Sequence, residues 1–315
     1  MPSHPSRYGT GALSAIGNTP IAELVRVVPA GSARVLVKLE WANPTGSMKD
    51  RMALSAIAGA IDSGALAPGD TIVEYTAGST GISLAFVGAA LGYPVHIVSS
   101  DAFAEEKLRT MRAYGAYVEE VPSDRGRINE SLIRAVIARA GEVSAQPGHW
   151  ACDQLNNHDA IPGYHALGEE IWAQSEGRVD AFVQAVGTAH SIHGVGHVLR
   201  SYHPSVHVTA VEPAESAVLS GGPSGSHRIE GTGIGFVPPL WEPNEVDEIA
   251  QVTSDDAMAM TRRLATEEGL FAGTSSGANV VTALRVAERL GPDATVVTVL
   301  CDSGLRYLST ELYQV

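Results

Sequence analysis

The fold is decided by the stretch TIVEYTAGSTGISLAFVGAAL, which occupies residues 71–91. Residues 71–75 are mainly β-branched and apolar, which predicts a buried strand, and the apolar run 82–91 predicts a helix. The residues between them, Thr76–Gly81, are small, hydroxyl-bearing or Gly, as in a tight strand-to-helix turn. The stretch therefore predicts a βα unit, the building block of a parallel sheet covered by helices.

The same alternation continues along the chain, which predicts an α/β protein with mostly parallel sheets. Strands are expected at 95–99, 117–121, 181–186, 206–211 and 295–300, and helices at 104–114, 130–140, 192–202, 255–267 and 276–290. The pattern breaks in the loop-rich segment 147–157, where we place a domain boundary. We expect a small α/β domain at 43–153 and a large α/β domain made of 1–42 and 154–315. The Gly- and Pro-rich excursion 213–242 is of a kind that often carries function.

Composition and charge narrow the classes of partner. The 315 residues are 44% hydrophobic and 18% charged, and 21 basic against 35 acidic side chains give a net charge of −14. Such a charge repels nucleic acids and anionic membranes, so we expect neither as a partner. No apolar run reaches the ~18 residues that span a bilayer, and Met1–Pro5 lacks a leader pattern, so a cytoplasmic location is expected. Cys152 and Cys301 are expected to be buried free thiols.

Four turns carry residues suited to chemistry at the carboxyl ends of strands. In Asn43–Arg51, Lys49 falls in the first turn of a helix, where a cation is poorly placed unless its pKa is depressed. Such a lysine can form a Schiff base with a carbonyl, although an ordinary exposed lysine fits this segment equally well. Thr76–Gly81 can present backbone N–H groups to a carboxylate, or can simply cap a helix.

The other two turns have different chemistry. Gly187–Ser191 offers N–H groups and hydroxyls to a phosphate, but it lacks the lysine of a nucleotide triphosphate loop. Cys301–Gly304 ends a strand with a short hydroxyl at Ser303. Four such turns with different chemistries indicate one assembled site.

These turns and several further segments together resemble the cysteine synthase and cystathionine β-synthase family of fold type II pyridoxal-phosphate (PLP) enzymes. The matching stretches keep the family's order and are Ile16–Pro20, Lys38–Glu40, Asn43–Arg51, Thr76–Gly81, Val186–Ser191, Gly231–Pro238, Gly273–Gly277, Asp302–Gly304 and Arg306–Ser309. The resemblance implies two open, twisted, mostly parallel sheets of the tryptophan synthase β-like type. It also implies a homodimer that acts on a small amino-acid substrate.

The resemblance assigns roles to residues of this chain. Lys49 is implied to bind PLP covalently and to act as general acid and base. The implied substrate-binding residues, chiefly for the α-carboxylate, are Thr76, Ala77, Gly78, Ser79 and Thr80, together with Gln154 and Gly233. Ser79 also faces the cofactor's 3′-oxygen, and Ser303 faces the pyridine nitrogen. The implied phosphate-binding residues are Gly187, Thr188, Ala189, His190 and Ser191.

The implied reaction is β-substitution on an O-activated L-serine, as in cysteine synthesis from O-acetylserine and sulfide. A serine hydroxyl at the pyridine nitrogen agrees with this, because it lacks the negative charge that would keep the ring protonated. Two alternatives stay open: β-elimination of a serine, threonine or cysteine type, and a relative without catalysis. Three segments depart from the family pattern. Ser79 replaces an Asn, Ala189 and His190 replace two Gly of the phosphate loop, and 153–159 differs from the family's Q-F-x-N-P-A-N.

Two competing interpretations are weaker. His190, His193 and His197 are spaced three and four apart, but the outer two lie ~10 Å apart along a helix, too far to share a zinc ion. We therefore expect no metal site. The glycines of Gly231–Gly235 are followed by Pro238 and Pro239, which do not open a helix as a dinucleotide fingerprint requires.

Overall fold

The computed structural model describes residues 8–125 and 130–314, which form two compact units. Unit 1 comprises the chain up to Ile16 and Lys49–Gly163, and unit 2 comprises Gly17–Met48 and Tyr164–Val315. Residues 8–16 and 154–163 thus group with unit 1, whereas the sequence assigned both to the large domain, and residues 43–48 group with unit 2, whereas the sequence assigned them to the small one. The domain boundaries expected at 43 and 153 stay a prediction, because compactness alone does not define where an independently folding domain ends. Residues 1–7, examined above for a leader, lie outside the described residues.

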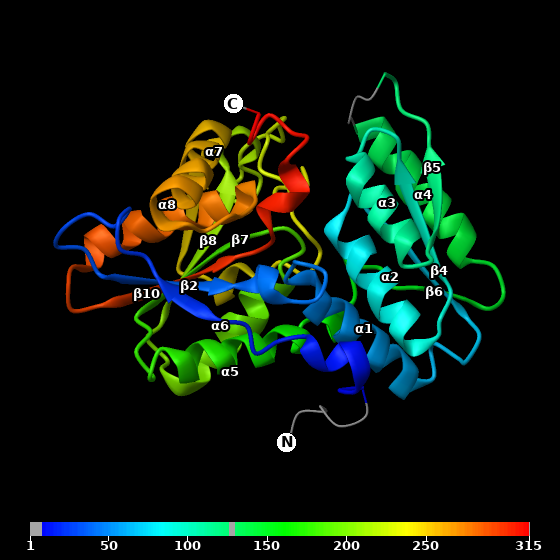
Figure 1. Ribbon diagram of the computed structural model, residues 1–315, viewed down its shortest axis with the longest axis horizontal. Coiled ribbons are helices and arrows are strands. Elements are labelled where there is room, and N and C mark those ends of the chain that lie inside the picture. Colours follow the sequence, from blue (N-terminus) through cyan, green and yellow to red (C-terminus); the bar gives the residue numbers. More distant parts are fainter. Residues whose placement is uncertain (1–7, 126–129, 315) are drawn as a thin grey trace. The chain divides into compact units, whose positions relative to one another are not determined.

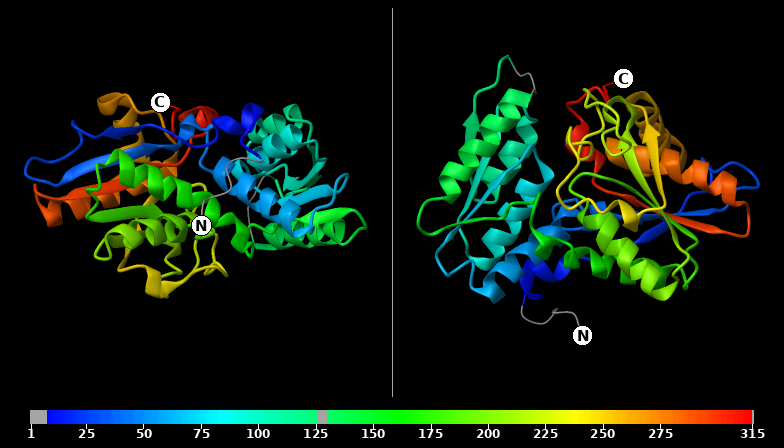
Figure 2. Two further views of the ribbon diagram at one scale, coloured as in Figure 1. Left: turned by 90° about the horizontal axis from the view of Figure 1, so that it is seen from below. Right: turned by 180° about the vertical axis from the view of Figure 1, so that it is seen from behind.

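Unit 1 is built on a four-stranded sheet in the order β5-β4-β3-β6, with every neighbouring pair parallel. Its strands are β3 (Thr71–Tyr75), β4 (Val95–Ser100), β5 (Tyr117–Val121) and β6 (His149–Ala151), and its helices are α1 (Lys49–Ser63), α2 (Ser79–Leu91), α3 (Glu105–Ala113) and α4 (Glu130–Ser144). Helices α2 and α3 lie in front of the strands in Figure 1, and α4 packs on β3, β4 and β6 (Figure 2). Alternation along β3 places Val73 in the apolar core under α4, so its neighbours Ile72 and Glu74 point to the opposite face.

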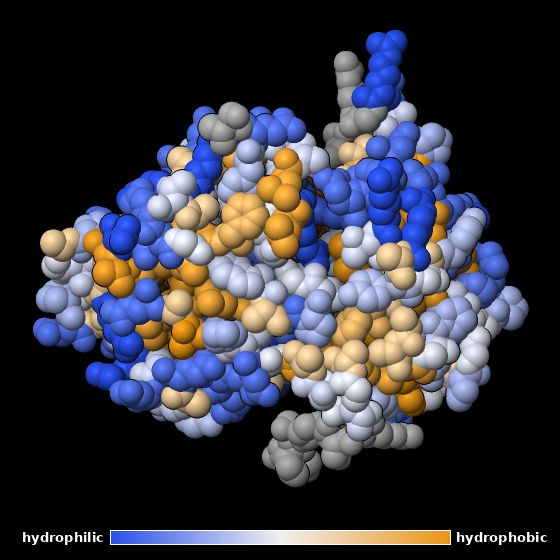
Figure 3. Space-filling model, in the orientation of Figure 1, coloured by the Kyte–Doolittle hydropathy of each residue, from blue (hydrophilic) through white to orange (hydrophobic). Residues whose placement is uncertain are grey.

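Helix α3 shows how a short amphipathic helix covers a sheet. Glu105, Glu106 and Arg109 are exposed, while Leu108 and Met111 are buried. The surface over α3 is accordingly hydrophilic in Figure 3. Lys107 lies among the buried residues with 6% exposure. Its aliphatic stem covers Gly78, because a Cβ built on that glycine would lie 2.6 Å from Lys107 Cδ.

Unit 2 is built on a six-stranded sheet in the order β1-β2-β10-β7-β8-β9, in which β1 is antiparallel and the other neighbours are parallel. Its strands are β1 (Ile21–Glu23), β2 (Arg34–Leu39), β7 (Ala181–Ala185), β8 (His207–Pro213), β9 (Glu248–Val252) and β10 (Thr295–Leu300). Its α-helices are α5 (His165–Gln174), α6 (His190–Tyr202), α7 (Ser254–Arg263) and α8 (Thr274–Leu290). Short 3-10 helices occur in both units, at Gly11–Ala15, Glu40–Ala42, His158–Ala160, Pro162–Tyr164, Ala214–Ser216, Pro243–Glu245 and Gly304–Tyr307.

The core of unit 2 lies between α8 and the central strands, with α6 packed against β7 and β8 (Figure 2). Val35, Val183 and Val296 contribute to it from the sheet, and Val280 and Leu284 from α8. Most of these positions are fully buried because a parallel sheet is covered by helices, as its near-continuous apolar strands predict. The predicted α/β class with two mostly parallel sheets is confirmed.

The strands β1, β2 and β9 and the helix α5 were not among the expected elements, and two local details also differ from the sequence predictions. The helix expected at 255–267 is α-helical only to Arg263 and continues as a π-helix over Leu264–Glu268. Helical periodicity in the sequence does not distinguish these two windings. A short strand, β6, runs within the expected loop 147–157, because a three-residue edge strand needs only the backbone of β3 beside it and no apolar run.

Candidate active site

Lys49 begins α1, and the structure holds the residues on both sides of it. Before it, Ser47 forms a β-bridge with Asp302, and the Met48 amide donates to the Cys301 carbonyl over 2.9 Å, both within unit 2. After it, in unit 1, the buried Asp50 carboxylate accepts a 2.6 Å hydrogen bond from Ser83 Oγ of α2. The half-buried Lys49 is therefore a residue of a well-anchored helix start, as its sequence context predicts.

The turn Thr76–Thr80 connects β3 to α2, and Gly78 is the residue before the helix. A hydrogen bond within the turn fixes the shape of the turn: the Gly78 amide donates to Thr76 Oγ1 over 3.0 Å. Ser99 Oγ of β4 donates to the Thr76 carbonyl over 2.8 Å. The first-turn N–H groups of α2 lack intrahelical acceptors and lie at the positive end of the helix dipole, which suits a carboxylate.

Gln154 lies beside this turn in unit 1. Its Oε1 accepts a 2.7 Å hydrogen bond from Thr80 Oγ1, and its Nε2 donates to the Tyr75 carbonyl over 3.1 Å. The Thr80 hydroxyl hydrogen is therefore used inside the protein and is not available to a ligand. The structure thus brings together Gln154 and the turn that the sequence assigned to the substrate.

The segment Gly187–Ser191 connects β7 to α6 in unit 2. Gly187 lies against another backbone, because a Cβ built on it would come within 2.7 Å of the Gly231 carbonyl oxygen. Ala189, one of the departures from the family pattern, has a left-handed φ of 72°, a conformation that favours glycine. The Thr188 hydroxyl contacts His190 Nδ1 over 2.7 Å, and α6 then runs for 13 residues from its N-terminal turn.

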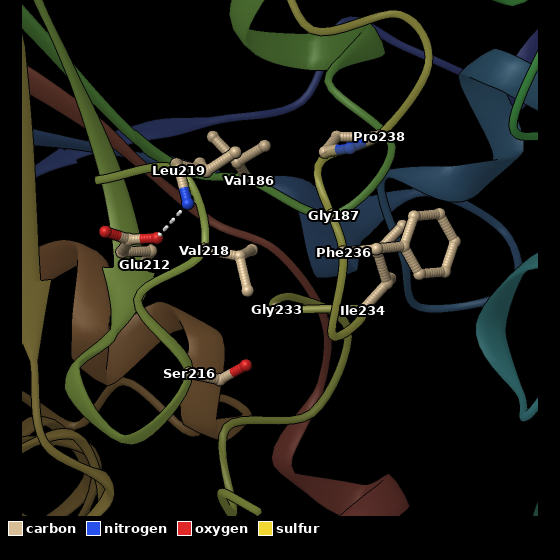
Figure 4. A pocket seen from close by; sticks show the side chains of 10 residues that line it. All are labelled: Val186, Gly187, Glu212, Ser216, Val218, Leu219, Gly233, Ile234, Phe236 and Pro238. Carbon is tan, nitrogen blue, oxygen red and sulfur yellow. Dashed lines mark hydrogen bonds between the residues drawn. The ribbon is translucent and has the colours of Figure 1, made fainter. Parts of the chain in front are cut away.

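Gly233 lies next to this turn (Figure 4). Its amide donates to the Val186 carbonyl over 3.1 Å, and Thr232 Oγ1 donates to the same oxygen over 2.6 Å. Gly187 and Gly233 line one pocket; its other lining residues are Val186, Glu212, Ser216, Val218, Leu219, Ile234, Phe236 and Pro238. The Gly- and Pro-rich excursion is therefore held against the end of β7.

Ser303 is held by two segments of unit 2. Its amide donates to the Gly46 carbonyl over 3.0 Å, and it forms a β-bridge with Ala272. Its Oγ accepts the Leu305 amide over 3.3 Å at the start of a 3-10 turn. Accepting this bond uses an oxygen lone pair and not the hydroxyl hydrogen, so Ser303 can donate to a neutral ring nitrogen.

The three histidines of α6 have separate partners. His193 Nδ1 lies 2.6 Å from a Glu245 carboxylate oxygen, and its Nε2 accepts the Glu242 amide over 3.2 Å. The His197 ring stacks on His165 at 5.4 Å between centroids. Among residues 8–125 and 130–314, no group of three or more His, Cys, Asp or Glu side chains is arranged to hold a metal ion. Cys152 and Cys301 are free and buried, as expected.

Comparison with known proteins assigns the chain to a family. The family model described as "Pyridoxal-phosphate dependent enzyme" matches residues 12–302. The chain belongs to the pyridoxal-phosphate dependent enzyme family. It is 44% identical over 301 residues to a cysteine synthase of Staphylococcus aureus, covering 95% of both chains. It is therefore a PLP-dependent enzyme of the cysteine synthase type, which catalyses β-replacement.

Two solved structures extend this similarity to the fold. O-acetyl serine sulfhydrylase isoform 3 from Entamoeba histolytica has a TM-score of 0.91 and 39% identity, covering 100% of this chain and 94% of that one. An O-ureido-L-serine synthase has a TM-score of 0.87 and 39% identity, covering 96% of this chain and 94% of that one. The PLP fold type II architecture expected from the sequence is confirmed.

The donor groups present fit PLP. The N-terminal turn of α6 with Gly187–Ser191 has backbone N–H groups and hydroxyls of the kind that bind a phosphate. The Ser303 hydroxyl has a hydrogen of the kind that a neutral ring nitrogen accepts. Lys49 belongs to unit 1 and these two segments to unit 2. Glu74 was missed in the sequence analysis; it is a buried polar residue beside the turn Thr76–Thr80, which we call the substrate turn because the sequence assigned it to the substrate. An acidic residue within the apolar strand TIVEY is visible in the sequence and could have drawn attention to it.

Proposed function

We propose that this enzyme makes L-cysteine and acetate from O-acetyl-L-serine and hydrogen sulfide. The Cβ–O bond of the donor breaks, the Cβ–S bond forms, and acetate leaves. The observation that carries the proposal is the 44% identity to a cysteine synthase over 95% of both chains. When bound, PLP supplies an electron sink that stabilises negative charge at the donor Cα.

The proposed roles of the residues follow from their positions. Lys49 holds the cofactor through Nζ, and the same amine removes the Cα proton of the donor and later returns a proton to Cα. The backbone N–H groups of Thr76–Thr80 hold the α-carboxylate, with Gln154 beside them. Gly187–Ser191 hold the cofactor phosphate, Ser79 its 3′-oxygen and Ser303 its ring nitrogen. Gly233 shapes the substrate site next to Gly187.

The charge around the excursion 213–242 supports an acetylated donor over a phosphorylated one. A dianionic phosphate leaving group requires a cation such as Arg for bidentate binding. Arg228, the basic residue nearest in sequence to Gly231–Pro239, already contacts Asp255 and Glu311. These carboxylates occupy the guanidinium, so it offers little net positive charge to a phosphorylated donor.

A donor and acceptor screen tests this function. The purified enzyme is incubated with O-acetylserine or O-phosphoserine, with and without sulfide, and products are identified by mass spectrometry. We expect cysteine to form from O-acetylserine only with sulfide, at a higher kcat/KM than from O-phosphoserine. Pyruvate formed at a comparable rate without sulfide would identify a β-eliminating enzyme. If the enzyme prefers O-phosphoserine and Arg228→Ala removes that preference, the assignment of O-acetylserine as the donor is wrong.

We also propose a homodimer in the cytoplasm. The dimer is carried over from the family resemblance, and the two free buried thiols agree with a reducing compartment. Within the described residues, no helix is both long and apolar enough to cross a bilayer. Light scattering coupled to size-exclusion chromatography measures the mass in solution, and a mass equal to that of one chain would contradict the dimer.

A further inference from the structure

Glu74 is a buried carboxyl group in the middle of an apolar strand. It lies on β3 with 2% exposure, between the fully buried Ile72 and Val73 on one side and the substrate turn on the other. Removing a carboxyl group from water carries a free-energy penalty unless hydrogen bonds compensate for it. An apolar residue would fit this strand without that penalty, so the contacts of Glu74 identify what the carboxyl group does.

Both carboxyl oxygens accept backbone amides. Glu74 Oε1 accepts the Tyr75 amide over 3.0 Å, and Oε2 accepts the Gln154 amide over 3.0 Å. Glu74 thus ties the end of β3 to the segment that carries Gln154.

The hydrogen bonds continue from Gln154 into the substrate turn. The Gln154 side chain donates to the Tyr75 carbonyl and accepts the Thr80 hydroxyl over 2.7 Å. Thr80 is in the first turn of α2, whose amides face the proposed carboxylate site. A continuous chain of hydrogen bonds therefore runs from Glu74 through Gln154 to Thr80, all within unit 1.

We propose that Glu74 is a positioning residue for the substrate α-carboxylate, acting through Gln154 and Thr80. This inference rests on the proposed function, which gives the Thr76–Thr80 turn its substrate. Glu74 itself touches neither substrate nor cofactor in this scheme. A glutamine cannot replace it, because an amide NH2 group accepts no hydrogen bond, whereas both oxygens of a carboxyl group keep a lone pair for a backbone amide even when the group is protonated.

The proposal predicts that replacing Glu74 raises KM and leaves kcat nearly unchanged. The α-carboxylate contact is made equally in the bound substrate and in the transition state, so its loss raises KM and leaves kcat unchanged. Loss of one such hydrogen bond corresponds to roughly a tenfold effect or more. We expect Glu74→Gln to raise KM for O-acetylserine at least about tenfold and to change kcat by less than about threefold. Glu74→Asp, whose shorter side chain cannot reach both amides, is the milder second variant if Glu74→Gln does not fold.

A double-mutant cycle tests the route through Gln154. If Glu74 acts through Gln154, adding Glu74→Gln to Gln154→Ala raises KM little further, because the link is already broken. Effects on KM that multiply in the double variant would show that Glu74 acts independently, and would overturn the proposal. Glu119→Gln is the matched control: it alters an acid of the same unit that bonds His96 and Arg139, and KM should stay unchanged.

Hydrogen exchange without substrate separates this proposal from the proposed function. Holoenzyme with Glu74→Gln should exchange faster than wild type in peptides covering 150–157 and 76–84, and equally fast in α4. Equal exchange in all peptides, or an unchanged KM in an active enzyme, overturns the positioning role and leaves the proposed function intact. If wild type does not turn over O-acetylserine, the proposed function fails, and the exchange comparison alone decides whether Glu74 holds Gln154 and Thr80 in place.

Discussion

At the scale of single residues, the structure explains why certain side chains cannot be exchanged for chemically similar ones. Ser303 accepts an amide through Oγ and keeps its hydroxyl hydrogen as a donor, whereas an aspartate at this position would only accept. Glu74 needs two acceptor oxygens, because each accepts one backbone amide. Both requirements follow from the hydrogen bonds around the residue.

Lys49 is predicted to be the lysine that carries PLP. Borohydride reduction of the holoenzyme followed by peptide mapping should find the pyridoxyl group on Lys49, and Lys49→Ala should lose turnover by several orders of magnitude. Lys38 is the internal comparison, because it is buried against Glu170 and the Thr19 carbonyl. A pyridoxyl group on Lys38 or Lys107 would refute the assignment.

Ser303→Ala and Ser303→Asp should have different effects on the reaction: the first on its rate and the second on its products. Removing the hydroxyl should lower kcat/KM modestly, because one neutral hydrogen bond contributes about 0.5–1.5 kcal/mol. An aspartate favours a protonated ring nitrogen and a stronger electron sink, so side transamination should appear. Assays for cysteine and for keto acid measure the two outcomes, and full β-substitution by Ser303→Asp without keto acid would refute the electronic argument.

Ala189→Gly should stabilise the protein. Ala189 has a φ of 72°, which costs a non-glycine residue roughly 1–2 kcal/mol. Glycine relieves that strain but gains freedom in the unfolded chain, so the net increase in the free energy of unfolding should be up to about 1 kcal/mol. Urea unfolding of the two proteins, each with excess PLP, measures it. A lower urea midpoint for the variant would show that the alanine methyl group contributes packing that outweighs the strain.

At the scale of elements, the close approach of α7 and α8 depends on one missing side chain. A Cβ built on Gly277 of α8 would lie 2.1 Å from the Ala257 carbonyl oxygen and 2.2 Å from Thr261 Oγ1 of α7. Both helices would have to separate to admit it, because a carbonyl oxygen in a helix backbone cannot rotate away. The glycine therefore sets the distance between these helices.

Gly277→Ala should lower the free energy of unfolding by about 1–3 kcal/mol or more, as overpacking does in well-packed cores. Gly141→Ala is the matched control, because Gly141 is exposed in α4 and its added Cβ would meet nothing within 4 Å. Relief of the glycine penalty in a helix should raise stability there by roughly 0.5–1 kcal/mol. Thermal melting compares the two, and melting temperatures that move in the same direction would contradict this account.

At the scale of the whole molecule, the buried carboxyl group makes stability depend on pH. Burial raises the pKa of Glu74 from 4.5 to about 8, although its bonds to the Gln154 and Tyr75 amides lower it. The unfolded chain therefore releases this proton near its ordinary pKa, and the folded protein retains it until about pH 8. Between these values the folded state binds one proton more, so stability falls as pH rises.

Comparison of wild type with Glu74→Gln isolates this contribution. Between pH 5 and 7.5 the wild-type free energy of unfolding should lose up to about 1.4 kcal/mol per pH unit relative to the variant, which has no proton to release. Above pH 8 the difference should stop changing. Urea midpoints measured across this range give both slopes. Parallel pH dependences for the two proteins would show that Glu74 is ionised throughout.

The sequence alone determined the class of fold and most of the elements that hold the candidate site. The strands at 71–75, 117–121 and 295–300 appear with the predicted bounds. The strand 295–300 is apolar or β-branched throughout, because helices cover both faces of a parallel sheet. The turns at 76–81 and 187–191 were also legible, because small residues between a strand and a helix serve local backbone geometry. The strands and the turns could both be predicted because each depends on the amino-acid composition of a short segment.

Only the tertiary structure decided which residues meet. The strands β6, β9 and β1 are short and lie at or near sheet edges, so they depend on a neighbouring backbone more than on their own composition. The contacts of Gly277 with α7 and of Gly187 with the Gly231 carbonyl also depend on the tertiary structure, because they join segments that are far apart in the chain. Glu74 combines both cases. Its charge in an apolar strand is visible in the sequence, but its partner Gln154 lies 80 residues away, and only folding brings that amide to its carboxyl oxygen.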